Sequence, residues 1–162
     1  MSKQTKPPMT AQQVFDKVLA GMRQQGAPSY YLDSKGNPGC RYRSTIDGVV
    51  RKCAAGLLLD DALYDPEFEG TAVDVHETGE ASGGEERMLE NAMIGSGVPR
   101  ECLRLVRDMQ GEHDVLAYDL VWGHIEDQDF LPEFEVRMMK IASAEGLEYA
   151  PPTSSNKETC HD

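Results

Sequence analysis

The stretch that decides the fold is Gly39-Cys-Arg-Tyr-Arg-Ser-Thr-Ile-Asp-Gly-Val-Val-Arg-Lys-Cys-Ala-Ala-Gly-Leu-Leu-Leu-Asp-Asp61. The pair Asp47-Gly48 supplies the positive φ angles that a two-residue hairpin turn requires, so the runs on either side of it predict two short antiparallel strands. The small residues 54–56 are followed by three leucines, which predicts a short buried helix packed closely on the hairpin.

Working outward, apolar residues recur at helical spacing on both sides of this stretch. Thr10 is a good N-cap with Gln13 as its capping-box partner, and Gly26 ends the helix that they begin. Further helices are predicted over residues 85–94, from Pro99 to 110, from 113 to about 125, and over 131–145. Gly111 and the acidic residues 127–129 are expected to interrupt the last three.

These elements predict an α+β fold, mainly a helical bundle with one small antiparallel β-hairpin. Residues 10–149 form the single expected domain, between a disordered tail over 1–9 and another over 150–162. Residues 71–76 alternate as a third short strand would, and 77–84 have the composition of a mobile loop.

Charge is unevenly distributed along the 162 residues, whose net charge is −12. Residues 1–56 carry nine Lys and Arg against three Asp and Glu, whereas residues 57–162 carry seven against 25. The second part, at −18, would repel nucleic acid and favour a basic partner. The chain has neither an apolar run long enough to span a membrane nor a signal peptide, so we expect a cytoplasmic protein without membrane contact.

The four cysteines have no spacing typical of a disulfide framework or of a zinc site. Cys53 and Cys102 are expected in the core, and Cys160 as a free exposed thiol. A nucleophilic Cys53, activated by a helix N-terminus and by His76, is a weaker interpretation than a packed core residue.

The candidates for metal-dependent chemistry are His113, Asp114 and His124, to which a metal site could add a cysteine such as Cys102. His113-Asp114 matches a dipeptide of metal-dependent phosphohydrolases, but that family also needs separate His and Asp ligands on other helices, and a match of two residues is expected by chance. We therefore predict no metal, no cofactor and no catalytic residue, and keep a small metal-dependent hydrolase as the alternative function.

Basic side chains on the hairpin are candidate anion contacts: Arg41, Arg43, Arg51 and Lys52. With Tyr30, Tyr31 and Tyr42 nearby, they suggest a nucleic-acid-binding accessory protein as a further alternative. The acidic remainder of the chain opposes nucleic acid, which is therefore not the expected partner. The predicted partner-binding residues are carboxylates: Asp60, Asp61, Glu67, Glu69, Glu85, Glu86, Glu126, Asp127 and Asp129.

Cys40-x-Tyr-Arg, the run from Arg51 to Asp61, Tyr64-Asp-Pro-Glu-Phe-Glu-Gly and Met109-Gln-x-x-His-Asp resemble motifs of small uncharacterised phage and prophage proteins. The resemblance covers roughly residues 10–149 and implies a phage context, with no reaction to carry over. We therefore expect an acidic interaction protein that acts in the host cytoplasm. It would bind and inhibit a host protein with a basic surface, such as a CRISPR-type defence component, by charge mimicry.

Overall fold

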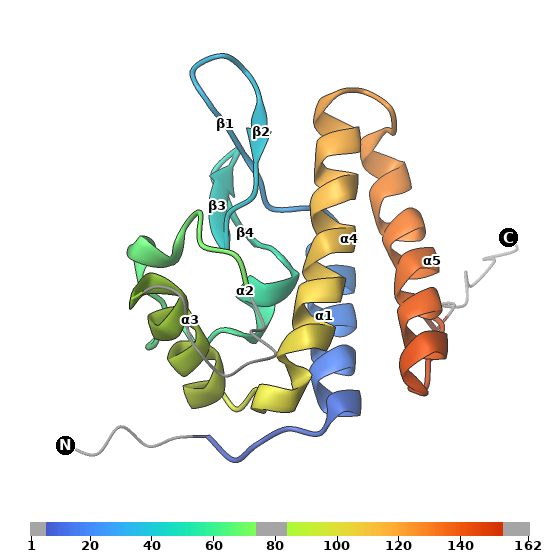
Figure 1. Cartoon of the computed structure of the whole chain (residues 1–162). Coiled ribbons are helices and arrows are strands. Elements are labelled where there is room, and N and C mark those ends of the chain that lie inside the picture. The colour runs from blue at the N-terminus through green and yellow to red at the C-terminus, as the bar shows by residue number, and fades with distance from the viewer. Residues whose placement is uncertain (1–5, 74–83, 154–162) are drawn as a thin grey trace, which may run out of the picture.

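The computed structural model describes residues 6–73 and 84–153. Its long helices are α1 (Ala11–Gln25), α3 (Gly84–Gly95), α4 (Leu103–Val121) and α5 (Asp127–Glu145), and the short ones are α2 (Ala54–Leu58), η1 (Pro66–Phe68) and η2 (Arg100–Cys102). Two small antiparallel sheets stand beside the α1, α4 and α5 bundle (Figure 1). The predicted α+β, mainly helical fold is confirmed.

The predicted hairpin is β3 (Arg43–Ile46) paired with β4 (Val49–Lys52). Asp47 and Gly48 have φ angles of 52° and 77°, as the two-residue turn requires. A second hairpin, β1 (Tyr31–Leu32) with β2 (Pro38–Gly39), was not predicted. Its two-residue strands are too short to show a period, and its loop is held instead by the Asp33 carboxylate, which accepts the backbone N–H groups of Lys35 and Asn37.

Helix α2 packs closely on the segment before β3, as we predicted from the small residues 54–56. A Cβ on Gly56 would overlap the carbonyl oxygen of Tyr42, so only glycine fits there. The same carbonyl accepts the N–H of Cys53, the N-cap of α2. The start of α2 therefore lies directly against the backbone of the hairpin, and a side chain at position 56 would prevent this approach.

Two predicted helix boundaries are wrong. Helix α4 runs through Gly111 without interruption, because Met109, His113 and Leu116 are all buried on one face of it. That packing outweighs the roughly 1 kcal/mol by which glycine disfavours a helix. Helix α5 begins at Asp127 rather than Leu131, since acidic residues in a first turn interact favourably with the helix dipole.

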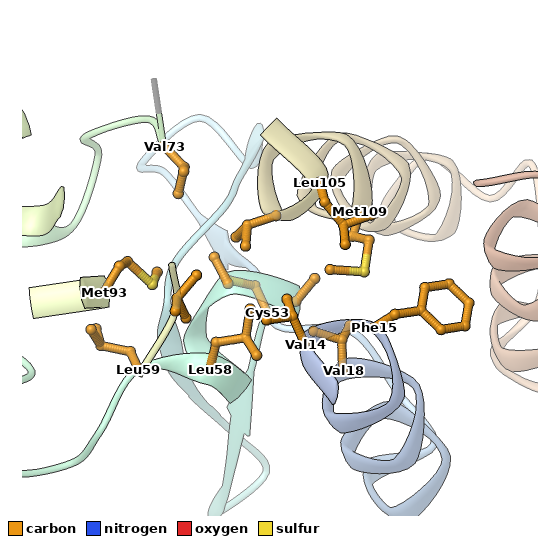
Figure 2. Packing of buried hydrophobic residues seen from close by; sticks show 14 of the residues in the cluster. Val14, Phe15, Val18, Cys53, Leu58, Leu59, Val73, Met93, Leu105 and Met109 are labelled. Atoms are coloured by element: carbon orange, nitrogen blue, oxygen red, sulfur yellow. The ribbon is translucent and has the colours of Figure 1, made fainter. Parts of the chain in front are cut away.

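The core lies between α1, α2, α4 and α5 (Figure 2). Cys53 is in its centre beside Val14 and Leu58, and Cys102 is also buried, both as predicted. Residues 71–73 have no regular structure. The rest of the predicted third strand, most of the predicted loop and Cys160 lie outside the described residues.

Both ends of the described chain are held against the bundle. Met9 donates its N–H to the carbonyl of Gly97 at 2.8 Å, and Lys6 pairs with Asp60 at 2.7 Å. At the other end, Glu148 donates its N–H to the side chain of Gln12. Within the described part of the chain, no helix has the length and apolarity needed to cross a membrane.

Candidate functional site

A cleft of about 720 Å³ opens beside α4. One wall is formed by β2 and the residues that follow it, and another by residues 70–73. Helix α4 supplies the third wall with Arg107, Gln110, Gly111, Asp114 and Tyr118. These α4 residues share one face of the helix because α4 continues through Gly111. The break that was wrongly predicted at Gly111 would have separated them.

Hydrogen bonds hold the Asp114 carboxylate in this cleft. Its Oδ1 accepts hydrogen bonds from the Nε2 of Gln110 and from the Nδ1 of His113, the latter at 3.0 Å. Gln110 is itself fixed, because its Oε1 accepts the N–H of Ala55 at 2.8 Å. The carboxylate is therefore positioned by two side chains of its own helix, one of which is anchored to α2.

His113 is completely buried, and its protonation state follows from its neighbours. The backbone N–H of Ser29 donates to Nε2 at 3.1 Å, and a backbone N–H has no other role than donor. The proton of the neutral imidazole is thus on Nδ1, where it is donated to Asp114. His113 holds the segment before β1, α4 and the Asp114 carboxylate together.

The ligand atoms of Cys40, His113 and Asp114 lie within 4.8 Å of one another, as in a metal site. The hydrogen bonds of His113 do not fit such a site. To coordinate through Nδ1, the neutral ring would have to carry its proton on Nε2, where it would meet the N–H of Ser29. His124 lies beyond the end of α4, is exposed and contacts Asp119, so the pair predicted for a hydrolase is not brought together.

The cysteines of the cleft are poor nucleophiles. Burial, followed by the neighbouring Asp114 carboxylate, raises the pKa of Cys40. Burial also raises the pKa of Cys53, whose sulfur accepts the N–H of Gly56. The low thiolate pKa that a helix N-terminus would give Cys53 is therefore absent, and its place in the core agrees with the structural interpretation.

The predicted hairpin cations lie in three different surroundings. Arg43 and Lys52 share Asp61 at 2.5 and 2.8 Å, and Arg43 also lies 4.1 Å from the ring centre of Tyr64. The guanidinium of Arg41 lies 4.4 Å from the ring centre of Tyr31, and both residues line the cleft. Arg51 lies on β4, outside the cleft.

Several of the predicted partner-binding carboxylates are engaged inside the molecule. Asp60 and Asp61 form the ion pairs with Lys6, Arg43 and Lys52 described above. The carboxylate of Glu69 accepts the N–H groups of Tyr42 and Arg43 and the hydroxyl of Tyr64. These three hold the strands and their connections in place.

The other predicted carboxylates lie at separate places on the surface. Glu67 is on η1, and Glu85 and Glu86 form the first turn of α3. Glu126, Asp127 and Asp129 lie together at the start of α5, where Glu126 and Asp129 form a capping box. This last group directly follows, in the chain, a turn and a helix end with aromatic side chains.

Those side chains form what we call the aromatic corner, at the turn between α4 and α5: Tyr118, Trp122 and His124. Trp122 is 59% exposed, and its ring centre lies 5.8 Å from that of Tyr118 and 6.1 Å from that of His124. The carboxylates of Asp119, Glu126, Asp127 and Asp129 belong to the same turn and its flanking helix ends. A large exposed aromatic side chain beside charged groups is typical of a protein-binding surface.

Sequence reasoning did not identify Gln110, Tyr118, Trp122 or Arg107 as functional residues. Each lies in an apolar helical pattern or beside one, which resembles core packing in the sequence. The spacing of Arg107, Gln110, Asp114 and Tyr118 by three or four residues was the available signal, because it places them on one helix face.

In comparisons with protein-family models, curated proteins and solved structures, no match to this chain was found. The resemblance to phage proteins therefore stays a prediction, and function has to be argued from the geometry.

Proposed function

We propose that this protein acts by binding another protein, with the aromatic corner as its contact surface. The observation that supports the proposal is the exposure of Trp122, which is 59% accessible although its ring centre lies 5.8 Å from that of Tyr118. Tryptophan and tyrosine contribute large contact areas at a small entropic cost, so they dominate many protein interfaces.

The surroundings of Trp122 indicate the chemistry of the partner. Asp119, Glu126, Asp127 and Asp129 are all found within seven residues of it in the sequence, at the end of α4 and at the start of α5. A partner with an apolar pocket bordered by Lys or Arg would complement this arrangement, since opposite charges around a buried anchor give specificity and speed association. The partner that we propose is basic, as the charge distribution predicts. Its contact surface is one compact site, instead of acidic residues spread over several helices.

The biological setting that we propose is a phage protein in the host cytoplasm that inhibits a host macromolecule, such as a component of a CRISPR-type defence system. The phage-like motifs and the −18 charge of residues 57–162 support this setting. Because Asp60, Asp61 and Glu69 are used within the fold, mimicry of nucleic-acid charge would depend on the other predicted carboxylates, among them those at the start of α5.

The test compares capture by tagged wild-type protein and by two variants from host lysate, with identification by mass spectrometry. Trp122→Ala removes the proposed anchor, and Met139→Ala, an exposed residue of α5 outside the aromatic corner, is the matched control. Loss of a tryptophan anchor costs about 2 kcal/mol or more, so we expect at least a roughly 30-fold loss of affinity in the first variant alone.

The affinity of the protein for the captured partner is then measured at increasing salt concentrations. Affinity for a basic partner should fall as the salt concentration rises, because exposed charges are screened. A partner that binds the wild type and Trp122→Ala equally, or with an affinity independent of salt, would refute the aromatic corner as the contact surface.

A further inference from the structure

We infer that two copies of this chain associate through the exposed side of α4, with the two helices antiparallel. The contact is made by four residues that we call the α4 stripe: Arg104, Gly111, Val115 and Trp122. The inference does not rest on the proposed partner of the aromatic corner. It goes beyond that proposal, because a second copy would cover Trp122.

The α4 stripe is one line along the outer side of the helix. Its residues follow one another at intervals of seven, four and seven positions, so each lies within about 20° of Arg104 around the helix axis. The Arg104 side chain is 70% accessible, and Val115 and Trp122 are 45% and 59% exposed. The opposite side of α4 is buried and packs on α1, α2 and α5 (Figure 1). The stripe is therefore a surface that the described residues leave uncovered.

The spacing of the α4 stripe is the same in both directions along the helix. A two-fold axis level with His113 places Arg104 opposite Trp122 of the second copy, and Gly111 opposite Val115 of the second copy. The symmetry then repeats both contacts. A parallel arrangement would place Arg104 against Arg104, where the like charges repel each other. The stripe is thus complementary to itself only when the two helices are antiparallel.

Each end of the antiparallel contact joins a cation to an aromatic ring. The guanidinium of Arg104 would lie over the indole of Trp122 of the second copy, an arrangement that is favourable where water is partly excluded. The ion pair of Arg104 with Asp108 is 3.9 Å long, whereas two other arginines pair with glutamates at 2.6 Å. Arg104 is therefore weakly held in its own chain. On the cleft side of the stripe, Arg107 comes opposite Tyr118 of the second copy in the same way.

The centre of the contact joins a residue without a side chain to an apolar one. Apart from the helix's own backbone, no heavy atom of the described residues lies within 4 Å of the position that a Cβ would have on Gly111. Val115 of the second copy would enter this open space, which lets the two helices approach closely. Burial of the exposed valine contributes the hydrophobic part of the binding energy.

The expected dimer is weak. On the α5 side of the stripe, Asp108 approaches Asp119 of the second copy, and Arg104 between them offsets only part of the repulsion. One helix from each copy also buries less than the roughly 1,600 Å² of a standard interface. We therefore expect a dissociation constant in the micromolar range. A protein that binds Trp122 would compete with the second copy and shift the equilibrium toward the monomer.

The first experiment is sedimentation velocity of the full chain from micromolar to millimolar concentration. We expect a reversible change from monomer to dimer. Val115→Asp places two carboxylates near the two-fold axis and should raise the dissociation constant about tenfold or more. Met139→Asp is the matched control, because Met139 is 47% exposed on α5, outside the stripe, and should leave the constant unchanged. Circular dichroism spectra establish that both variants are folded.

A second pair of variants tests the antiparallel register. Trp122→Arg places a cation opposite Arg104 at both ends and should weaken the dimer about tenfold or more. Adding Arg104→Trp to this variant restores a cation opposite an aromatic ring at each end, so most of the affinity should return. Recovery by a second change eighteen positions away is expected only if the two positions meet in the dimer.

Three results would overturn the inference: a wild type that is monomeric at millimolar concentration, equal effects of Val115→Asp and Met139→Asp, or a double variant as weak as Trp122→Arg alone. None of these results bears on the capture of a host protein through Trp122, so the two proposals fail separately.

Discussion

The backbone N–H of Ser29 donates to the Nε2 of His113 over 3.1 Å, between a residue that precedes β1 and one in the middle of α4. The same Ser29 bonds through its hydroxyl to Ser44 in β3 at 2.8 Å. One buried serine thereby connects both hairpins to the helix that forms the cleft. His113 transmits this contact to Asp114 through its other nitrogen.

Replacing His113 by alanine should destabilise the protein strongly. The change leaves the Ser29 N–H without an acceptor, removes one donor from Asp114 and creates a cavity beside Phe130, whose ring centre lies 6.1 Å from the imidazole. We expect the free energy of unfolding to fall by roughly 3 kcal/mol, as measured by urea denaturation.

His124→Ala is the control for this change, because the His124 side chain is exposed and the side chains of Asp119 and Trp122, which it contacts within the described part of the chain, lie close to it in the sequence. Its effect should stay within about 0.5 kcal/mol. Equal effects of the two substitutions would contradict the structural role assigned to His113.

Substitution by alanine should change the stability of the protein in opposite directions at Gly56 and at Gly111. Gly56→Ala places a methyl group on the Tyr42 carbonyl, and a backbone neighbour cannot give way, so we expect a loss of about 2 kcal/mol or more. Gly111→Ala adds a methyl group within α4, where, apart from the helix's own backbone, no heavy atom of the described residues lies within 4 Å, and should stabilise the protein by about 0.5–1 kcal/mol. Thermal unfolding of both variants measures the difference. A stabilising Gly56→Ala would show that α2 does not approach the backbone so closely.

Gly111 also illustrates why part of the fold was predictable from sequence and part was not. The Thr10–Gln13 capping box and the Asp47-Gly48 turn depend on atoms a few residues apart, and both were predicted correctly. The continuation of α4 through Gly111 depends instead on burial against α2 and α5, which no local pattern contains. Tertiary packing outweighed local propensity there.

The candidate site was less accessible to prediction than the fold. Arg41 and Asp114 were both singled out, but as members of different sites, since the cleft joins segments that are far apart in the chain. Arg43 and Lys52 looked equivalent to Arg41 in the sequence, and only the position of Asp61 distinguishes them. Whether a charged residue is available for a ligand depends on its spatial neighbours, which a single sequence does not specify.

The surroundings of Glu135 predict how the stability of the protein depends on pH. Its carboxylate accepts Arg23 Nε and the Tyr149 hydroxyl, both at 2.6 Å, and it is only 12% exposed. Burial alone would raise the pKa of Glu135, but the hydrogen bonds from Arg23 and Tyr149 outweigh it and hold the pKa below the ordinary 4.5.

A carboxyl with a depressed pKa in the folded state stabilises the protein fully above its unfolded pKa, and this contribution is lost as the pH falls through the folded pKa. We therefore expect Glu135→Gln to lower the free energy of unfolding at pH 7 by about 2 kcal/mol and to reduce the loss of stability below pH 4.5. Denaturation at a series of pH values measures both effects. Glu133→Gln, at an exposed position two residues earlier, is the control and should follow the wild type throughout. If Glu135→Gln retained the full acid dependence of the wild type, the ion pair that holds α1 to α5 would not be the source of it.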